Sequence, residues 1–179
     1  ARFEKVFHYG AGLTFIEALR AAGGWSQVDR AFVHPPTSTG QILHPDRYLA
    51  GWVPEDLSAI GLPECSCDEE SHIGRVLGEF GVSLFLARDL ATRPSSARLA
   101  ARLAGDLCFT IHDSKSGEDR WVWYLSFFDE LGASDFASAA ERLGLELWNL
   151  DDSGRRVGVM MGEDPLPDPA WFSNESEGE

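Results

Sequence analysis

The first third of the chain carries hydrophobic residues at helical spacing, interrupted by glycine and proline. One apolar series begins after Gly12, another ends before Pro35, and Gly23-Gly24 lies between them. Because glycine commonly follows the last turn of a helix, the pattern predicts two helices, antiparallel or oblique to each other across the glycine joint. The residues expected on their buried faces are Phe15, Ile16, Ala18, Leu19, Ala22, Trp25, Val28, Ala31 and Phe32.

Residues 35–49 form a corner in which several local signals agree. Two prolines end the preceding helix, and Ser38 precedes Gln41 by three residues, which is the spacing of a capping box. We therefore expect a helix to start at Ser38. Because Pro45 fits its first turn poorly, we expect a broken or two-part helix that runs to about Leu49.

Helical spacing returns in residues 76–87, where the apolar stripe is wide and is interrupted by Gly78 and Gly81. A glycine inside a helix costs about 1 kcal/mol relative to alanine, so we expect another backbone to approach closely at these positions. A further helix is expected to begin at Pro94-Ser95-Ser96 and to end at Gly105.

The apolar period then changes from helical to alternating. Residues 107–112 and 121–127 predict a β-hairpin, and Ser134 is placed to cap a following helix. After Gly144 the pattern predicts a second hairpin, which ends with residues 156–161. This order predicts an α+β fold, in which an N-terminal helical unit packs beside an antiparallel β-sheet with helices on one face.

Four regions follow from these patterns. Residues 1–50 are expected to form the helical unit with its corner, and residues 51–73 an irregular connection. Residues 74–162 should carry the remaining helices and the sheet, sharing one core with the helical unit. Residues 163–179 are proline-rich, contain six acidic residues and no basic one, and are expected to be a disordered tail.

Composition narrows the class of protein. The chain has 179 residues, is 44% hydrophobic and carries a formal charge of −14, which argues against nucleic acid and anionic membranes as partners. Its three cysteines do not suggest a disulfide scaffold, no apolar run is long enough to span a bilayer, and no signal peptide opens the chain. These observations do not assign the protein to a cellular compartment. The start at Ala1, within an apparently folded segment, leads us to expect that an upstream part is missing.

Three motifs carry a resemblance that covers most of residues 3 to 145. They are Phe7-x-Tyr9-x-x-Gly12-x-x-Phe15-Ile16-x-Ala18-Leu19, Gly23-Gly24-Trp25-x-x-Val28-Asp29, and Pro35-Pro36-Thr37-Ser38-Thr39-x-Gln41-Ile42-Leu43-His44-Pro45-x-x-Tyr48-Leu49. Weaker matches are Gly78-Glu79-Phe80-Gly81 and the hairpin–helix unit that ends near Leu143. On these motifs the chain resembles the C-terminal portion of a bacterial family of zincin-like proteins, predicted zinc metallopeptidases of the HExxH type.

The chain also departs from that family. Such proteins hold zinc through two histidines on one helix and a further acidic residue, while the helix glutamate acts on the bound water. No HExxH exists here, and no two of the five histidines are four residues apart. His8 and Gly40 stand where the family pattern tends to carry proline and glutamate. The resemblance thus implies a neighbouring part of the fold without catalytic residues, and zinc only if a catalytic segment lies upstream.

Five residues are candidates for a binding site. Ser38, Thr39, His44 and Tyr48 gather polar groups at the corner, and Tyr48 would face the same way as His44 if the helix continued. Glu79 lies in an apolar helix, where burial would raise its pKa and require a partner. The alternatives are that His44 satisfies a loop carbonyl, and that Glu79 faces solvent or pairs with an arginine.

Cys65-x-Cys67 with His72 is a weaker candidate for a metal site, because structural zinc sites usually show two well-spaced pairs of ligands. The alternative is a surface loop with incidental thiols. We expect no metal and no cofactor in this chain.

Three classes of function stay open. The first is a non-catalytic accessory or protein-interaction domain with a protein or peptide partner. The second is the substrate-cleft half of a zinc metallopeptidase whose catalytic helix lies upstream of Ala1. The third is a small-molecule binding module, which an enclosed apolar pocket near His44 and Glu79 would indicate.

Overall fold

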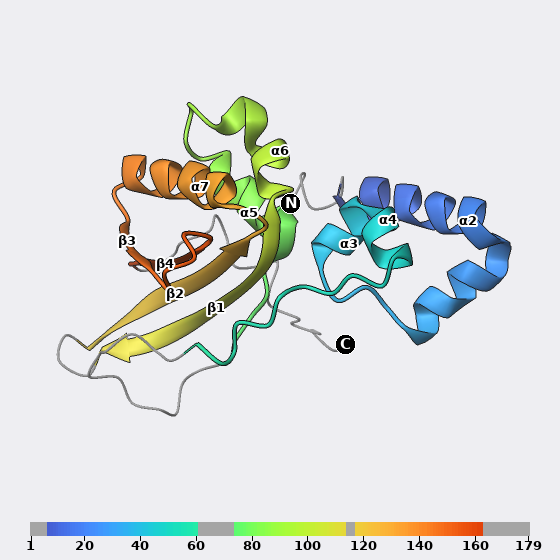
Figure 1. Ribbon diagram of the computed structural model, residues 1–179, viewed down its shortest axis with the longest axis horizontal. Coiled ribbons are helices and arrows are strands. Elements are labelled where there is room, and N and C mark those ends of the chain that lie inside the picture. Colours follow the sequence, from blue (N-terminus) through green and yellow to red (C-terminus); the bar gives the residue numbers. More distant parts are fainter. Residues whose placement is uncertain (1–6, 61–73, 114–116, 163–179) are drawn as a thin grey trace, which may run out of the picture.

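A four-stranded antiparallel sheet is the centre of the larger half of the computed structural model, which describes residues 7–60, 74–113 and 117–162. The strands lie in the order β1-β2-β4-β3, and helices α5, α6 and α7 cover one face (Figure 1). The α+β prediction is confirmed. The bounds are β1 Leu103–Asp113, β2 Glu118–Phe127, β3 Glu146–Asn149, β4 Arg156–Met161, α5 Gly78–Leu86, α6 Ser96–Ala100 and α7 Glu130–Arg142.

Aromatic side chains fill the space between the sheet and its helices. Phe85 from α5 and Phe136 from α7 stack with their ring centroids 5.0 Å apart, and Trp123 from β2 meets both rings edge-on. Trp121 packs against the same cluster, as the alternation of β2 predicts. Offset and edge-to-face pairs of this kind stabilise a core beyond the area that they bury.

The opposite face of the sheet is covered by the chain that leaves the helical unit. Leu57 packs there against Phe109, Val122 and Tyr124. Just before it, the backbone N–H of Glu55 donates to the carbonyl of Ala104 over 2.8 Å. This extended stretch therefore lies directly against β1.

Gly105 explains why the stretch can lie so close. A Cβ at this position would overlap the carbonyl oxygen of Glu55 and lie 2.9 Å from its nitrogen. The prediction that Gly105 ends a helix is wrong, because α6 ends at Ala100 and Gly105 belongs to β1. A short 3₁₀ helix, Arg93–Ser95, precedes α6, near its predicted start.

The helical unit lies at the other end of the molecule (Figure 1). It contains the π-helical turn η1 (Phe7–Ala11), α2 (Gly12–Val33), α3 (Thr39–Leu43) and α4 (Pro45–Leu49). Within α2, Gly23 and Gly24 leave the helical conformation, and the positive φ of 70° at Gly24 suits glycine. The predicted joint between two oblique helices and the predicted two-part helix at the corner are both confirmed.

The core of the helical unit is small. Phe15, Leu19, Val28 and Ala31 are buried, and Ile16, Ile42 and Tyr48 pack against them. The prediction that Ala22, Trp25 and Phe32 are also buried is wrong, since all three side chains are exposed, those of Trp25 and Phe32 by 63% and 80%. The helices α3 and α4, which pack against α2, are five residues long each and cover a narrow stripe of it.

The boundaries of α7 also differ in part from the prediction. The helix begins at Glu130, where the Asp129 carboxylate accepts the N–H of Gly132 over 2.8 Å, so Ser134 is not its cap. Its end is as predicted, with a positive φ of 74° at Gly144. Among the residues that the structure describes, no helix is both long and apolar enough to cross a membrane.

Candidate functional site

Glu79 lies in the first turn of α5, where the helical unit meets the rest of the protein. It is only 5% exposed, and both carboxylate oxygens have partners. Oε1 lies 2.8 Å from Nε2 of His44, and Oε2 accepts a hydrogen bond from Nη1 of Arg47 over 3.1 Å. Arg47 also donates to the carbonyl of Ala101 over 2.7 Å. The cluster therefore fastens α4 to α5 and to the end of α6.

Burial raises the pKa of the Glu79 carboxyl above its ordinary value, while His44 and Arg47 act in the opposite direction. Of the two alternatives considered for Glu79, pairing with an arginine is the one found here. The ring of His44 contacts the Glu79 carboxylate. It does not satisfy a loop carbonyl, which was the alternative to a binding role for His44.

Thr39 joins the same contact. Its hydroxyl accepts the backbone N–H of Phe80 over 3.1 Å. Gly78 has a φ of 67°, and a Cβ there would overlap the Thr39 hydroxyl and lie 3.3 Å from the Thr39 backbone nitrogen. The expected close approach of another backbone is thus confirmed at Gly78. It is wrong at Gly81, where a Cβ would meet the side chain of Leu77 in its own segment.

Asp106 is a second buried carboxylate that the sequence pattern did not single out. It is 4% exposed and accepts the N–H groups of Leu77 and Gly78 at 2.9 and 3.0 Å, and the indole N–H of Trp123 at 2.9 Å. Burial raises the pKa of this carboxyl, and the three donors oppose the shift. Asp106 therefore caps α5 from the neighbouring strand. In the sequence, the one available signal for a role of Asp106 was its position as a lone acid at the start of an apolar strand.

The capping box is not formed as predicted. Ser38 is the residue before α3 and has extended backbone angles, but its buried hydroxyl has no hydrogen-bond partner among the described residues. Gln41 instead accepts the N–H of Thr37 over 2.6 Å and donates to the carbonyl of Trp52 over 2.5 Å. Gln41 thus holds the corner to the chain beyond α4, and this second bond draws it away from the Ser38 backbone.

A cavity of about 10 Å³ lies among Ser38, Gly40, Glu79 and Asp106. This is about the volume that one water molecule needs. It does not have the size of the apolar pocket that would indicate a small-molecule binding module.

Tyr48 does not join the other candidates. The helix breaks at His44, so residues 44 and 48 do not share a helical face. The Tyr48 hydroxyl donates to the carbonyl of His34 over 2.6 Å, and its ring meets Phe15 edge-on. The structure therefore brings Ser38, Thr39, His44 and Glu79 together and places Tyr48 apart from them.

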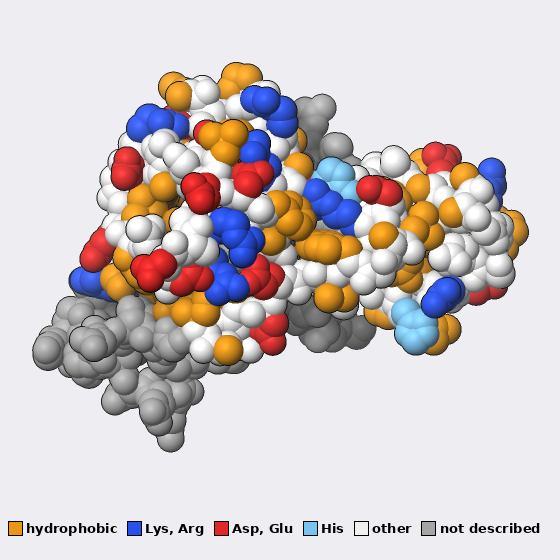
Figure 2. All heavy atoms as spheres, viewed as in Figure 1, with side chains coloured by type: hydrophobic (Ala, Val, Ile, Leu, Met, Phe, Trp, Pro, Cys, Tyr) orange, Lys and Arg blue, Asp and Glu red, His pale blue; other side chains and the backbone are white. Residues whose placement is uncertain are grey.

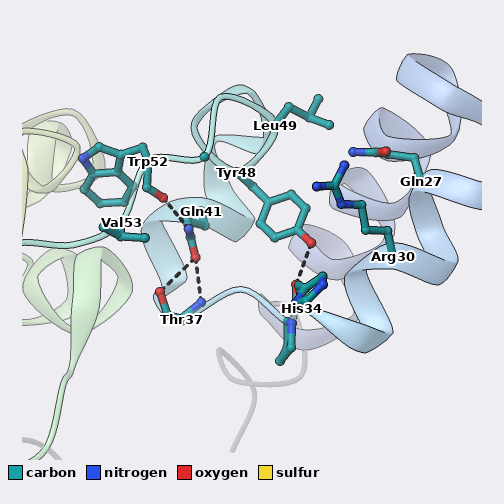
Figure 3. Close-up of a pocket in the computed structure, with 11 residues that line it drawn as sticks. Gln27, Arg30, His34, Thr37, Gln41, Tyr48, Leu49, Trp52 and Val53 are labelled. Carbon is teal, nitrogen blue, oxygen red and sulfur yellow. Dashed lines mark hydrogen bonds between the residues drawn. The ribbon is translucent and has the colours of Figure 1, made fainter.

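Tyr48 belongs to an open pocket of about 280 Å³ between α2 and the end of α4. Figure 3 shows Gln27 and Arg30 reaching from α2 toward the side of this pocket where Tyr48 lies. Neither side chain has a hydrogen bond or ion pair with any residue that the structure describes. Sequence reasoning missed both, because a polar residue on the outer face of a helix gives no local signal.

Cys65, Cys67 and His72 lie outside the described residues, as does the acidic segment 163–179. Within the described ranges, no group of three or more His, Cys, Asp or Glu side chains is arranged to hold a metal ion.

The chain matches no protein-family model, no curated protein and no solved structure in the comparisons made. The resemblance to zincin-like proteins accordingly stays a prediction.

Proposed function

We propose that this chain is a non-catalytic protein-interaction domain, and that its helical unit is the binding end. The observation that carries the proposal is the distribution of exposed apolar side chains. Eight of the twelve large hydrophobic residues found exposed in the described ranges fall within residues 9–53. They are Tyr9, Leu13, Trp25, Phe32, Val33, Leu43, Leu49 and Val53.

Exposed side chains of this size have an energetic consequence. Burying one large apolar side chain contributes about 1.5–3 kcal/mol, and a partner that covers several of them gains this contribution on binding. Aromatic residues are also the usual anchors of protein interfaces, and Trp25 and Phe32 are the most exposed large rings of α2. Figure 2 shows hydrophobic side chains reaching the outer tip of this end of the molecule.

The chemistry of the Glu79 cluster supports a role without catalysis. Both oxygens of the carboxylate are engaged by His44 and Arg47, and the adjoining cavity has room for about one water. A general base or metal ligand needs a lone pair that faces a space large enough for a substrate, and this cavity does not provide one. The cluster is better suited to holding the helical unit in place.

The proposal is tested by selecting phage-displayed peptides against the immobilised full chain and measuring their affinity for variants. In Trp25→Ser/Phe32→Ser, we expect the affinity of the selected peptides to fall at least tenfold. The matched control is Leu90→Ser/Leu131→Ser, which alters two equally exposed apolar residues in the other half of the molecule. An equal loss in the control, or a selection that enriches no peptide, refutes the proposal.

A further inference from the structure

We infer that the pocket between α2 and α4 is a carboxylate-binding site, and that it takes an acidic side chain of the protein partner. The inference rests on the proposed function and adds the chemistry of one ligand group to it. It depends on three observations: the charge of the pocket, the unpaired donors within it, and its size and position.

The formal charge of the pocket lining is positive. Arg30 is the one formally charged residue among those that line it, and no aspartate or glutamate of the described ranges does so. Asp29 precedes Arg30 in the sequence but points to another side of the helix, and no acid occupies the positions three and four residues away, which are Ser26, Gln27, Val33 and His34. The protein has 29 acidic and 15 basic residues, yet none of the described acids pairs with this arginine.

Two other polar side chains of the pocket are already used by the protein. The Tyr48 hydroxyl donates to the His34 carbonyl, and Gln41 is bound to Thr37 and to Trp52 (Figure 3). The guanidinium of Arg30, the amide of Gln27 and the imidazole of His34 have no partner among the described residues and remain for a ligand, and the guanidinium is the one that carries a permanent charge. A guanidinium presents a planar fork of N–H groups that matches the two oxygens of a carboxylate.

The pocket has room for a side chain of a bound peptide, and its position suits one. Its volume of about 280 Å³ lies just below the range of about 300–1,000 Å³ that is typical of sites for drug-sized ligands. Leu49 and Val53 line the pocket and belong to the exposed apolar set as well. A peptide that lies on those apolar residues can thus place an acidic side chain against Arg30.

The test uses the full chain, labelled with ¹⁵N, and two synthetic probes. These are N-acetyl-Phe-Glu-amide and N-acetyl-Phe-Gln-amide, which differ in the side-chain carboxylate. We expect the glutamate probe to shift the amide signals of Gln27, Arg30, Tyr48 and Trp52, and the glutamine probe to bind at least fivefold more weakly.

Variants assign the effect to Arg30. Arg30→Gln should weaken binding of the glutamate probe at least fivefold, and Arg30→Lys should retain part of it, because lysine keeps the charge without the fork. Arg20→Gln is the matched control, since Arg20 is also on α2 but lies outside the pocket, near Trp25. An unchanged dispersion of the amide spectrum verifies that each variant is folded.

The inference is overturned if the two probes bind equally, if Arg30→Gln binds the glutamate probe as the wild type does, or if the shifted signals lie elsewhere. Any of these results leaves the proposed function standing, provided that the Trp25→Ser/Phe32→Ser variant still loses the selected peptides. Conversely, if the selection fails while the glutamate probe binds at Arg30, the proposed function fails and the carboxylate site remains.

Discussion

Arg47 and Arg30 belong to the same helical unit, but their surroundings differ. Arg47 donates to Glu79 and to the carbonyl of Ala101, and its guanidinium lies over the rings of Trp52 and Phe128, 5.4 and 5.2 Å from their centroids. Arg30 has no partner among the described residues. An arginine with all its contacts inside the protein supports the fold, whereas one that faces an open pocket is available to a ligand. Mutations of Arg47 and its partners should therefore lower stability, whereas mutation of Arg30 should weaken ligand binding.

The largest effect is expected from Arg47→Ala. The substitution leaves Glu79 buried with His44 as its remaining partner and removes the donor to Ala101. Breaking a buried ion pair typically costs about 3–5 kcal/mol, and because His44 stays, we expect about 3 kcal/mol. Urea unfolding followed by tryptophan fluorescence measures this loss.

The double variant Arg47→Met/Glu79→Gln is the control for that result, since it removes both charges and keeps similar volumes. It should recover part of the lost stability, because no buried charge is left unpaired. If Arg47→Ala unfolds at the same urea concentration as the wild type, the contrast between the two arginines is refuted.

A smaller loss is expected from Gln41→Ala. Gln41 is 4% exposed, and its removal leaves the N–H of Thr37 and the carbonyl of Trp52 without their partner. Stranding a buried polar group costs about 1–3 kcal/mol, so we expect about 2 kcal/mol in the same unfolding assay. Ser38→Ala is the neighbouring control and should change stability by less than about 0.5 kcal/mol, as the Ser38 hydroxyl has no partner. A larger loss of stability in Ser38→Ala than in Gln41→Ala would indicate that Ser38 caps α3 after all.

Glu79 should also give a pH dependence of a definite sign. Burial raises its pKa in the folded state above the ordinary value of 4.5. At pH values between the pKa of the unfolded state and the raised pKa of the folded state, the folded state binds more protons than the unfolded state. The Glu79 contribution to the free energy of unfolding therefore falls as the pH rises through this window. Glu79→Gln should remove this contribution. The difference in the free energy of unfolding between the wild type and the variant should therefore change with pH across the window. A difference that stays constant from pH 4 to 7 contradicts the raised pKa.

The smallest effect on stability is expected from Arg30→Gln. The side chain is exposed and makes no ion pair with the described residues, and such surface changes usually stay within about 0.5 kcal/mol. Thermal unfolding of this variant should match the wild type, while binding of the glutamate probe is at least fivefold weaker. A stability loss comparable to that of Arg47→Ala would show that Arg30 also supports the fold.

Sequence reasoning succeeded where one segment determines its own conformation. The glycine joint in α2, the break at Pro45 and the end of α7 at Gly144 depend on residues within a few positions of one another. It failed where the deciding partner is distant in the chain. Gln41 is bound by Trp52, and α5 is capped by Asp106, which is 28 residues away from Gly78.

The candidate site shows the same division. The sequence indicated that Glu79 would need a partner, but not that His44 and Arg47, 35 and 32 residues away, supply it. The pocket at Arg30 depends on which of the described residues surround it in three dimensions, and no local pattern encodes that. Burial of Trp25 and Phe32 was predicted from spacing alone, and spacing does not reveal how much surface a neighbouring helix can cover.

The position of Glu55 has a consequence for how the two halves separate. Its backbone N–H bonds to Ala104, and its carboxylate accepts the Ser126 hydroxyl over 2.6 Å and pairs with Arg156. If the Glu79 cluster opens, the helical unit is still anchored to the sheet at this point, a few residues after α4. Local unfolding of α2, α3 and α4 can then proceed while the sheet stays intact, and hydrogen exchange should report these helices as a separate cooperative unit of lower protection.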